Sequence, residues 1–139
     1  MKDIYNELSP AVLIGAAALD ADNTPTAVDL QGFTAALVQI AVGIGGITFD
    51  ATNKVEFKLT HSDDGSTYTA VADADVQLPS GQSVGAGGIV KSLTAAHAAA
   101  AVYKVGYIGG KKYLKLLADF SGAHGAPPPL AATAIRGPA

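Results

Sequence analysis

The stretch Lys54-Val55-Glu56-Phe57-Lys58-Leu59-Thr60 alternates polar and apolar side chains without interruption. Because successive side chains of a β-strand point to opposite faces, Val55, Phe57 and Leu59 share one face and the polar residues share the other. This pattern is typical of a half-buried strand in an antiparallel sheet. It predicts a β-sheet protein whose sheet has one face against a core and the other toward solvent.

Two hairpins are predicted next to and beyond this strand. The run His61-Ser62-Asp63-Asp64-Gly65-Ser66 precedes a β-prone segment over residues 67–71, and Asp-Gly between two such segments is a strong hairpin signal. Gly109-Gly110 separates residues 101–108 from residues 111–119 in the same way. In this second hairpin Tyr103, Val105 and Tyr107 share one face of the first strand, and Tyr113, Lys115 and Leu117 share one face of the return strand. We expect cross-strand aromatic pairs there.

The rest of the chain gives weaker signals. Residues 37–42 predict a strand, with Val38, Ile40 and Val42 on one face. Residues 10–19 are ambiguous between strand and helix, and residues 95–100 could form one helical turn capped by Thr94. Three further segments are strand candidates: residues 26–30, 88–93 and 130–135.

These segments amount to about seven or eight short strands in an all-β chain. Such a series is typical of an antiparallel β-sandwich, a jelly roll or a small barrel, and it predicts a single β domain over residues 1–139. Residues 1–10 are interpreted as an N-terminal arm. The Gly/Pro-rich loop at 121–129 is expected to deliver residues 125–139 as a C-terminal arm or edge strand. We expect residues 1–8, or the arm after Pro127, to contact other subunits.

The composition favours a surface that is covered by other proteins. Charged residues make up 15%, the net charge is −3, and large side chains are scarce, with no Trp, one Met and four Phe. Ala and Val fill little volume, so we expect a thin core that gains stability from neighbouring subunits. Nucleic-acid binding is not expected, because no basic stripe is present to neutralise phosphates. Nor is a membrane partner expected, because the apolar run at 8–19 is short and interrupted.

One enzyme motif matches the sequence. Gly81-Gln82-Ser83-Val84-Gly85 fits G-x-S-x-G, the nucleophile elbow, and His97 and His124 follow it. An elbow needs a strand-to-helix turn, but Gly85-Ala86-Gly87-Gly88 would weaken any helix beginning there. We therefore interpret the match as a glycine-rich loop and expect neither an enzyme nor any catalytic residue.

Other polar and glycine-rich patterns fall short of a binding site. Gly43-Ile44-Gly45-Gly46 and the run at 85–88 resemble phosphate loops, but they open no helix and are interpreted as strand ends, bulges or points of close backbone approach. No cofactor and no metal are expected. The acidic residues follow no EF-hand spacing. The histidines follow no ligand spacing either, and are expected on the surface or in loops. These acidic residues and histidines are Asp20, Asp22, Asp63, Asp64, Asp73, Asp75, His61, His97 and His124.

Three segments carry a resemblance to a known group of proteins. Residues 59–71, with "HSDDG" between an apolar strand and a Thr-Tyr-Thr-Ala-Val run, resemble a segment of small virion structural proteins of tailed bacteriophages. Residues 103–115 resemble the companion Y-x-x-G-Y-x-G hairpin, although Lys111, Lys112 and Lys115 stand where Arg is commoner. Residues 129–138 are similar to the closing strand. Together these segments cover about half of the chain.

The resemblance implies a structural role in a phage particle. It implies a capsid decoration or cement protein on the major capsid protein at the outer surface of the shell, made in the host cytoplasm and assembled as a trimer or dimer. The alternatives are a tail-tube or head–tail joining subunit and, from another class, a carbohydrate-binding module or adhesin that uses Tyr103, Tyr107 and Tyr113. The resemblance implies no catalytic residues.

Overall fold

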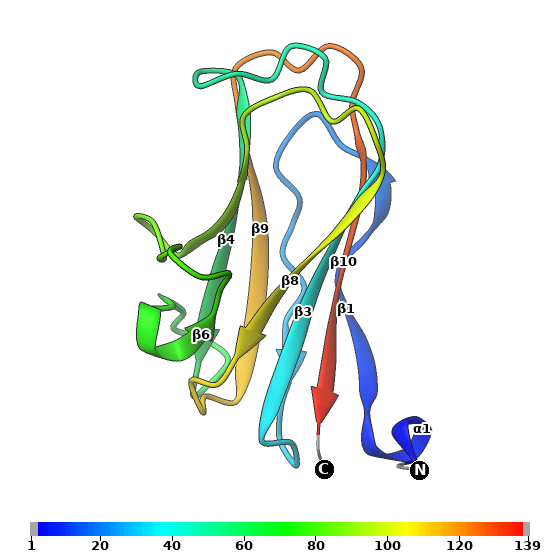
Figure 1. Ribbon diagram of the computed structural model, residues 1–139. Coiled ribbons are helices and arrows are strands. Elements are labelled where there is room, and N and C mark those ends of the chain that lie inside the picture. Colours follow the sequence, from blue (N-terminus) through cyan, green and yellow to red (C-terminus); the bar gives the residue numbers. More distant parts are fainter. Residues whose placement is uncertain (1–2, 138–139) are drawn as a thin grey trace.

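The computed structural model describes residues 3–137, which form two antiparallel sheets packed face to face (Figure 1). Residues 1–2 and 138–139 lie outside the described part of the chain. Sheet A has the strand order β1 (Ser9–Ala18), β10 (Pro129–Gly137), β3 (Ala35–Val42), β8 (Ala101–Tyr107) and β6 (Val76–Gln77). Sheet B has the order β2 (Val28–Asp29), β9 (Tyr113–Ser121), β4 (Lys54–Ser62) and β5 (Thr69–Ala70), with β7 (Ile89–Leu93) also paired to β4.

This architecture confirms the all-β prediction and, among the three expected forms, the antiparallel sandwich. The two sheets remain separate and do not close into a barrel. Between residues 3 and 137 there are ten strands, of which β2, β5 and β6 have two residues each. The helical part consists of α1 (Ile4–Glu7), which buries no residue, and the single 3₁₀ turn Asp73–Asp75.

The core lies between the inner faces of the two sheets. Val55, Phe57 and Leu59 of β4 are fully buried, as the alternation predicts, and Val38 and Ile40 of β3 face them from sheet A. β9 contributes its own alternate residues from the position next to β4. Removal of this apolar area from water supplies the main driving force for packing sheet A on sheet B.

The prediction of a hairpin over residues 101–119 is wrong, because the two strands exist but do not pair with each other. β8 pairs with β3 and β6 in sheet A, whereas β9 pairs with β4 and β2 in sheet B. Residues 108–112 therefore carry the chain from one sheet to the other across the edge of the core. A period of two residues identifies a strand, but it does not identify the sheet to which that strand belongs.

The first hairpin is present in a short form. β5 pairs with β4 only through Thr60↔Ala70 and His61↔Thr69. The main partner of β4 is β9, with an unbroken register from Lys54↔Ser121 to Ser62↔Tyr113. The long-range pairing thus dominates the local one.

The first and the last strand both lie in sheet A. The ambiguous segment at 10–19 is the edge strand β1, and its partner β10 lies between β1 and β3. The expectation that residues 125–139 form an arm or edge strand is therefore wrong for the described part, because β10 is paired on both sides. Residues 95–100 form no helical turn; instead His97 makes a β-bridge to Gly45.

Candidate functional site

Three loops meet at one end of the sandwich, at the top of Figure 1: residues 43–49, 94–100 and 122–128. We call these loops the apolar end. Backbone hydrogen bonds join them: Gly45 N–H donates to His97 O (3.2 Å), His97 N–H donates to Gly45 O (3.0 Å), and Gly46 N–H donates to Ala126 O (2.7 Å). The hydroxyl of Thr48 also donates to Ala123 O at 2.7 Å. The apolar end is therefore a built surface in which each loop supports the next.

Close backbone approach explains the glycines of the first loop. A Cβ atom on Gly45 would lie 2.7 Å from Pro128 Cα and 3.0 Å from Ala126 O. No side chain fits at that distance, so the position requires glycine. The Gly43-Ile44-Gly45-Gly46 run thus serves loop packing, which agrees with its interpretation as a point of close approach.

The apolar end exposes large hydrophobic side chains and carries no charge. Ile44 is 66% exposed and Ile47 is 68% exposed. None of the residues in the three loops is Asp, Glu, Lys or Arg. The charged residue nearest to these loops in sequence is the exposed Asp50, next to Phe49. Large apolar side chains that are this exposed are typical of a protein-binding surface.

A hollow of about 700 Å³ lies beside the apolar end, where β1 and β3 finish and β8 and β10 begin. Its walls are small or apolar side chains, so it suits an apolar side chain of a partner rather than a polar substrate. The lining consists of residues 16–18, 41–43, 100–102 and 129–131.

The outer faces of the two sheets differ in chemistry. On sheet A, the outward positions of the four long strands include a single charged residue, Lys104. On sheet B, five of the ten outward positions of β4 and β9 are charged. The outward positions of sheet A include Pro10, Val12, Ala35, Leu37, Gln39, Ala41, Val102, Lys104, Gly106, Pro129, Ala131, Thr133 and Ile135. The five charged residues on sheet B are Lys54, Glu56, Lys58, Lys115 and Asp119.

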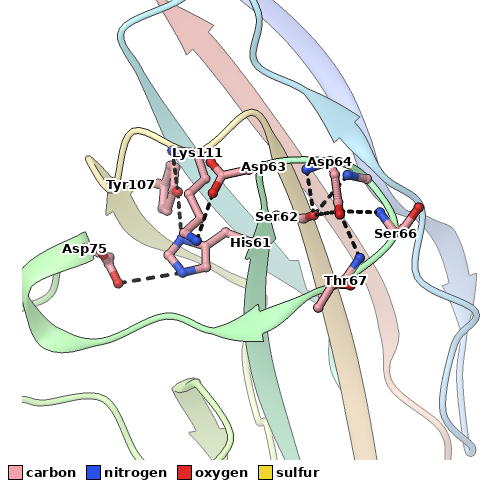
Figure 2. A network of polar contacts seen from close by, with 10 residues as sticks. His61, Ser62, Asp63, Asp64, Ser66, Thr67, Asp75, Tyr107 and Lys111 are labelled. Carbon is pink, nitrogen blue, oxygen red and sulfur yellow. Dashed lines mark hydrogen bonds and ion pairs between the residues drawn. The ribbon is translucent and has the colours of Figure 1, made fainter.

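A cluster of polar side chains at the other end joins the two sheets (Figure 2). His61 of β4 and Tyr107 of β8 are 4% and 1% exposed, and His61 Nδ1 lies 2.8 Å from the Tyr107 hydroxyl. That hydroxyl also accepts the backbone N–H of Lys111 at 3.2 Å. His61 Nε2 lies 3.9 Å from Asp75 Oδ2. The tautomer with its proton on Nε2 turns this donor toward the carboxylate and leaves Nδ1 to accept the Tyr107 hydroxyl proton.

Burial controls the protonation of this cluster. Desolvation lowers the pKa of His61, opposed by the charge of Asp75. Desolvation also raises the pKa of Tyr107. An Asp–His–Tyr arrangement is chemically suited to proton transfer, but the buried Tyr107 hydroxyl does not reach a solvent-facing substrate. The arrangement connects the sheets.

Asp64 caps the turn that follows β4 (Figure 2). Its Oδ1 accepts the backbone N–H groups of Ser66 (2.8 Å) and Thr67 (2.9 Å) and the hydroxyl of Ser62 (2.9 Å). These bonds, the one from Thr67 first, lower the pKa of Asp64 to about 2. The acidic pair at 63–64 thus belongs to the turn, with Asp63 paired to Lys111 Nζ at 3.2 Å.

The G-x-S-x-G match lies in a loop. Ser83 is exposed, and Gly85 makes a bridge to Ile89 where an elbow would begin a helix. The two histidines that follow it in sequence belong to the apolar end: His97 Nε2 lies 2.7 Å from the Tyr103 hydroxyl, and the His124 ring packs edge-on against Phe49 and Phe120. The structure does not bring the three residues of a triad together.

The histidines are more buried than the sequence suggested. His61, His97 and His124 are 4%, 9% and 7% exposed, although they were expected on the surface or in loops. Only His97 and His124 lie in loops, and aromatic neighbours cover all three rings. In residues 3–137 no three His, Cys, Asp or Glu side chains gather as metal ligands would.

The remaining acidic residues stabilise loops. Asp22 accepts the N–H of Phe120 at 2.7 Å, Asp73 accepts the N–H of Val84 at 2.6 Å, and Asp75 accepts the N–H of Ala72 at 2.8 Å. Asp20 lies in the exposed stretch after β1. These bonds hold the segments between strands.

The tyrosines named from the sequence do not form an open stacking platform. Tyr107 is buried, and the Nζ atoms of Lys91 and Lys112 lie 4.1 Å and 5.0 Å from the ring centres of Tyr103 and Tyr113. The rings thus contact the protein itself, through the core or through cation–π contacts.

Within residues 3–137, no helix has the length and hydrophobicity needed to cross a bilayer.

Comparison with known proteins gives a structural likeness. No protein-family model matches the chain, and no curated protein matches it. Among solved structures, the crystal structure of the SPBc2 prophage-derived protein YomS is similar, with a TM-score of 0.49 and 12% identity over 93% of this chain and 91% of that one. At this level of similarity, the match carries nothing about the binding partners of this chain.

The apolar end was not predicted from the sequence. Taken one by one, its three loops predict a glycine run at a strand end, a helical turn and a Gly/Pro linker. The signal that joins them is the complete lack of charged residues in three separate segments, each of which lies between two strands. Strands that run in opposite directions bring such segments to the same end of a sandwich.

Proposed function

We propose that the chain is a non-enzymatic structural protein of a bacteriophage virion, bound as a decoration or cement protein to the major capsid protein on the outer surface of the shell. The observation that carries the proposal is the apolar end, where Ile44 and Ile47 are exposed on three hydrogen-bonded loops without charge. In this proposal, the apolar end binds an apolar surface of the capsid shell.

The contact energy of one copy need not be large. Burying an isoleucine side chain stabilises a contact by about 1.5–3 kcal/mol, before the cost of association. A shell repeats its surface many times, and subunits joined to one another bind it together, so weak contacts add up to stable coverage. Because the loops are fixed by Gly45–His97 and Gly46–Ala126 hydrogen bonds, little entropy is lost on binding.

The resemblance of residues 59–71, 103–115 and 129–138 to small virion proteins supports the choice of a phage particle as the setting. It gives the proposed location, the capsid surface after synthesis in the host cytoplasm. A tail-tube or joining subunit would have the same β-rich composition, and the measurement below separates the two. A glycan-binding role has less support, because Tyr107 is buried and the half-buried Tyr103 and Tyr113 each have a lysine over the ring.

The copy number of the chain in purified particles tests the proposal. Quantitative mass spectrometry gives the ratio of this chain to the major capsid protein in particles of the phage that encodes it. A ratio near one supports decoration of the shell. A ratio of a few per cent would instead support a tail or head–tail joining subunit. Absence of the chain from particles would reject a virion role.

A pair of variants tests the surface. The double variant Ile44→Glu with Ile47→Glu places two charges on the apolar end and should abolish binding to shells that lack the chain. Ile108→Glu is the matched control, because Ile108 is also exposed, at 50%, but lies in the turn between β8 and β9 at the other end. Equal binding by both variants would reject the apolar end as the contact.

A further inference from the structure

On the outer face of sheet A, the two central strands β3 and β10 carry similar side chains at paired positions. β3 and β10 are neighbours, and their outward residues lie directly opposite one another as Leu37↔Ile135, Gln39↔Thr133 and Ala41↔Ala131. Each pair joins similar side chains: two branched aliphatic, two neutral polar, and two alanines. The two strands therefore present nearly the same pattern in opposite directions.

We propose that this face binds a second copy of the chain across a two-fold axis that runs between β3 and β10, along the strands. Such an axis places each β3 residue of one copy over its β10 counterpart in the other. Leu37 then meets Ile135 of the second copy, and Ala41 meets Ala131. The two middle rows meet as Gln39 against Thr133. Residue i contacts residue j and j contacts i, as an isologous interface requires.

The middle row suits this pairing because its groups can both donate and accept. The Gln39 amide carries two donors and a carbonyl acceptor, and the Thr133 hydroxyl carries one donor and two lone pairs. Each can satisfy the other after both leave water. A different partner would have to supply matching polar groups at the centre of an apolar face; a second copy already has them.

Charge and shape agree with the same arrangement. At the margin of the interface, Lys104 of β8 in one copy would lie opposite Val12 of β1 in the other. The aliphatic part of the lysine side chain can pack there while its amine stays in water. The axis keeps the two Lys104 side chains on opposite sides of the interface. Ala41 and Ala131 are small and lie where this face meets the hollow beside the apolar end, whereas the side chain of Gln77 lies over Gly106 at the margin. Small side chains on the two central strands allow two sheets to approach to about 10 Å.

The area is large enough for a specific dimer. Four strands about 4.8 Å apart and about eight residues long, at about 3.3 Å per residue, give a flat face of about 500 Å². Two such faces bury about 1,000 Å² in total, which is the lower limit for a specific interface. The outer face of sheet B has similar dimensions, but in a dimer its charged residues would face the charged residues of the second copy.

This inference does not rest on the proposed function, since it concerns the purified chain alone. Analytical ultracentrifugation of the full chain between about 1 and 200 μM should show a concentration-dependent dimer, with twice the chain mass of 13.9 kDa. A chain that stays monomeric over this range overturns the proposal.

Two charged variants test the pairing of side chains. Gln39→Lys and Thr133→Glu should each weaken the dimer at least about 100-fold, because each places two like charges in the dry centre of the interface. When the two variants are mixed, the introduced lysine of one copy lies over the introduced glutamate of the other, so a one-to-one heterodimer should form. Two variants that remain monomeric when mixed, with native far-ultraviolet circular dichroism, overturn the proposed axis.

The matched control is Thr60→Glu. Thr60 faces outward from β4 on sheet B, beside Lys115, and is the same residue type in the same kind of strand. It should leave the dimer unchanged within about two-fold. If it weakens association as much as Thr133→Glu does, the interface lies elsewhere.

Discussion

The outer faces of sheets A and B are both at least partly exposed to solvent, yet they are built from different side chains. On sheet B, Lys58 Nζ lies 2.6 Å from Asp119 Oδ2, and Lys54 lies 3.5 Å from Glu56, so charges interact within and across strands. On sheet A, the corresponding central positions hold Leu37, Gln39 and Ala41, and β10 adds two apolar residues and a threonine. Both sheets bury the same kind of inner face.

The difference shows that the same alternating pattern can give an outer face suited to solvent or an outer face suited to a protein partner. In β4 the outward residues keep that face in water, since covering charges costs several kcal/mol. In β3 and β10 the outward residues carry no charge, and the removal of their apolar groups from water is favourable. The sandwich therefore has one face suited to solvent and one suited to protein, and the apolar end adjoins the second.

The largest expected effect tests whether the two inner faces are equivalent. Ile40→Ala on β3 and Leu59→Ala on β4 each remove a fully buried side chain, and each should lower the free energy of unfolding by about 2–5 kcal/mol. Urea denaturation of both variants measures this. A loss below about 1 kcal/mol for Ile40→Ala alone would mean that sheet A depends less on the shared core than sheet B does.

The contact between the sheets gives a smaller effect. Tyr107→Phe removes the hydroxyl that is hydrogen-bonded to His61 Nδ1 and leaves this buried nitrogen without its partner. The expected loss of stability is about 1–3 kcal/mol in urea denaturation. Tyr5→Phe, at a ring that is 90% exposed, is the control and should change nothing measurable. Equal stability of the two variants would show that the hydrogen bond does not hold the sheets together.

The same histidine predicts a pH dependence. The pKa of His61 is lowered by burial from its ordinary 6.5, so below that pH the unfolded chain takes up a proton that the folded chain does not bind. Stability from this group is complete above pH 6.5 and falls as the pH drops toward the folded pKa. Urea midpoints between pH 7.5 and 5.5 should therefore decrease. His61→Gln should flatten this slope, and an unchanged slope would assign it to other groups.

The smallest expected effect concerns the charges that distinguish the faces. Lys58→Ala removes the ion pair with Asp119, whose hydrogen bond raises the pKa of Lys58. Because the pair is partly exposed, the loss should be about 0.2–1 kcal/mol and should diminish in 1 M salt. Lys104→Ala on sheet A should change stability by less than about 0.5 kcal/mol. A loss of stability that does not depend on salt in Lys58→Ala would indicate that the aliphatic part of Lys58 contributes by packing.

Several parts of the fold could be predicted from local pattern. The alternation at 54–60 gave β4 and its buried face, and residues 37–42 gave most of β3 with the correct side inward. Asp64-Gly65 marked a real turn, since Gly65 has a φ of 77° and Asp64 caps it. These features depend on neighbours in sequence, which a single chain displays.

Pairing between distant segments could not be predicted in this way. The Gly109-Gly110 turn looks like a hairpin tip, yet it connects β8 in sheet A to β9 in sheet B. The last strand, β10, was expected at an edge and is interior. Both errors have one cause: strand order is set by which faces cover each other in the core, and this information is spread over the whole chain. The apolar end was missed for the same reason.

The position of β10 also bears on how the protein is made. Residues 129–137 pair with β1, near the beginning of the chain, and with β3, so sheet A stays incomplete until the ribosome has released residue 137. Until then the open edges of β1 and β3 are exposed, and unpaired edges of this kind invite aggregation. A nascent chain of this sequence therefore gains from fast completion or from a chaperone that shields these edges during synthesis.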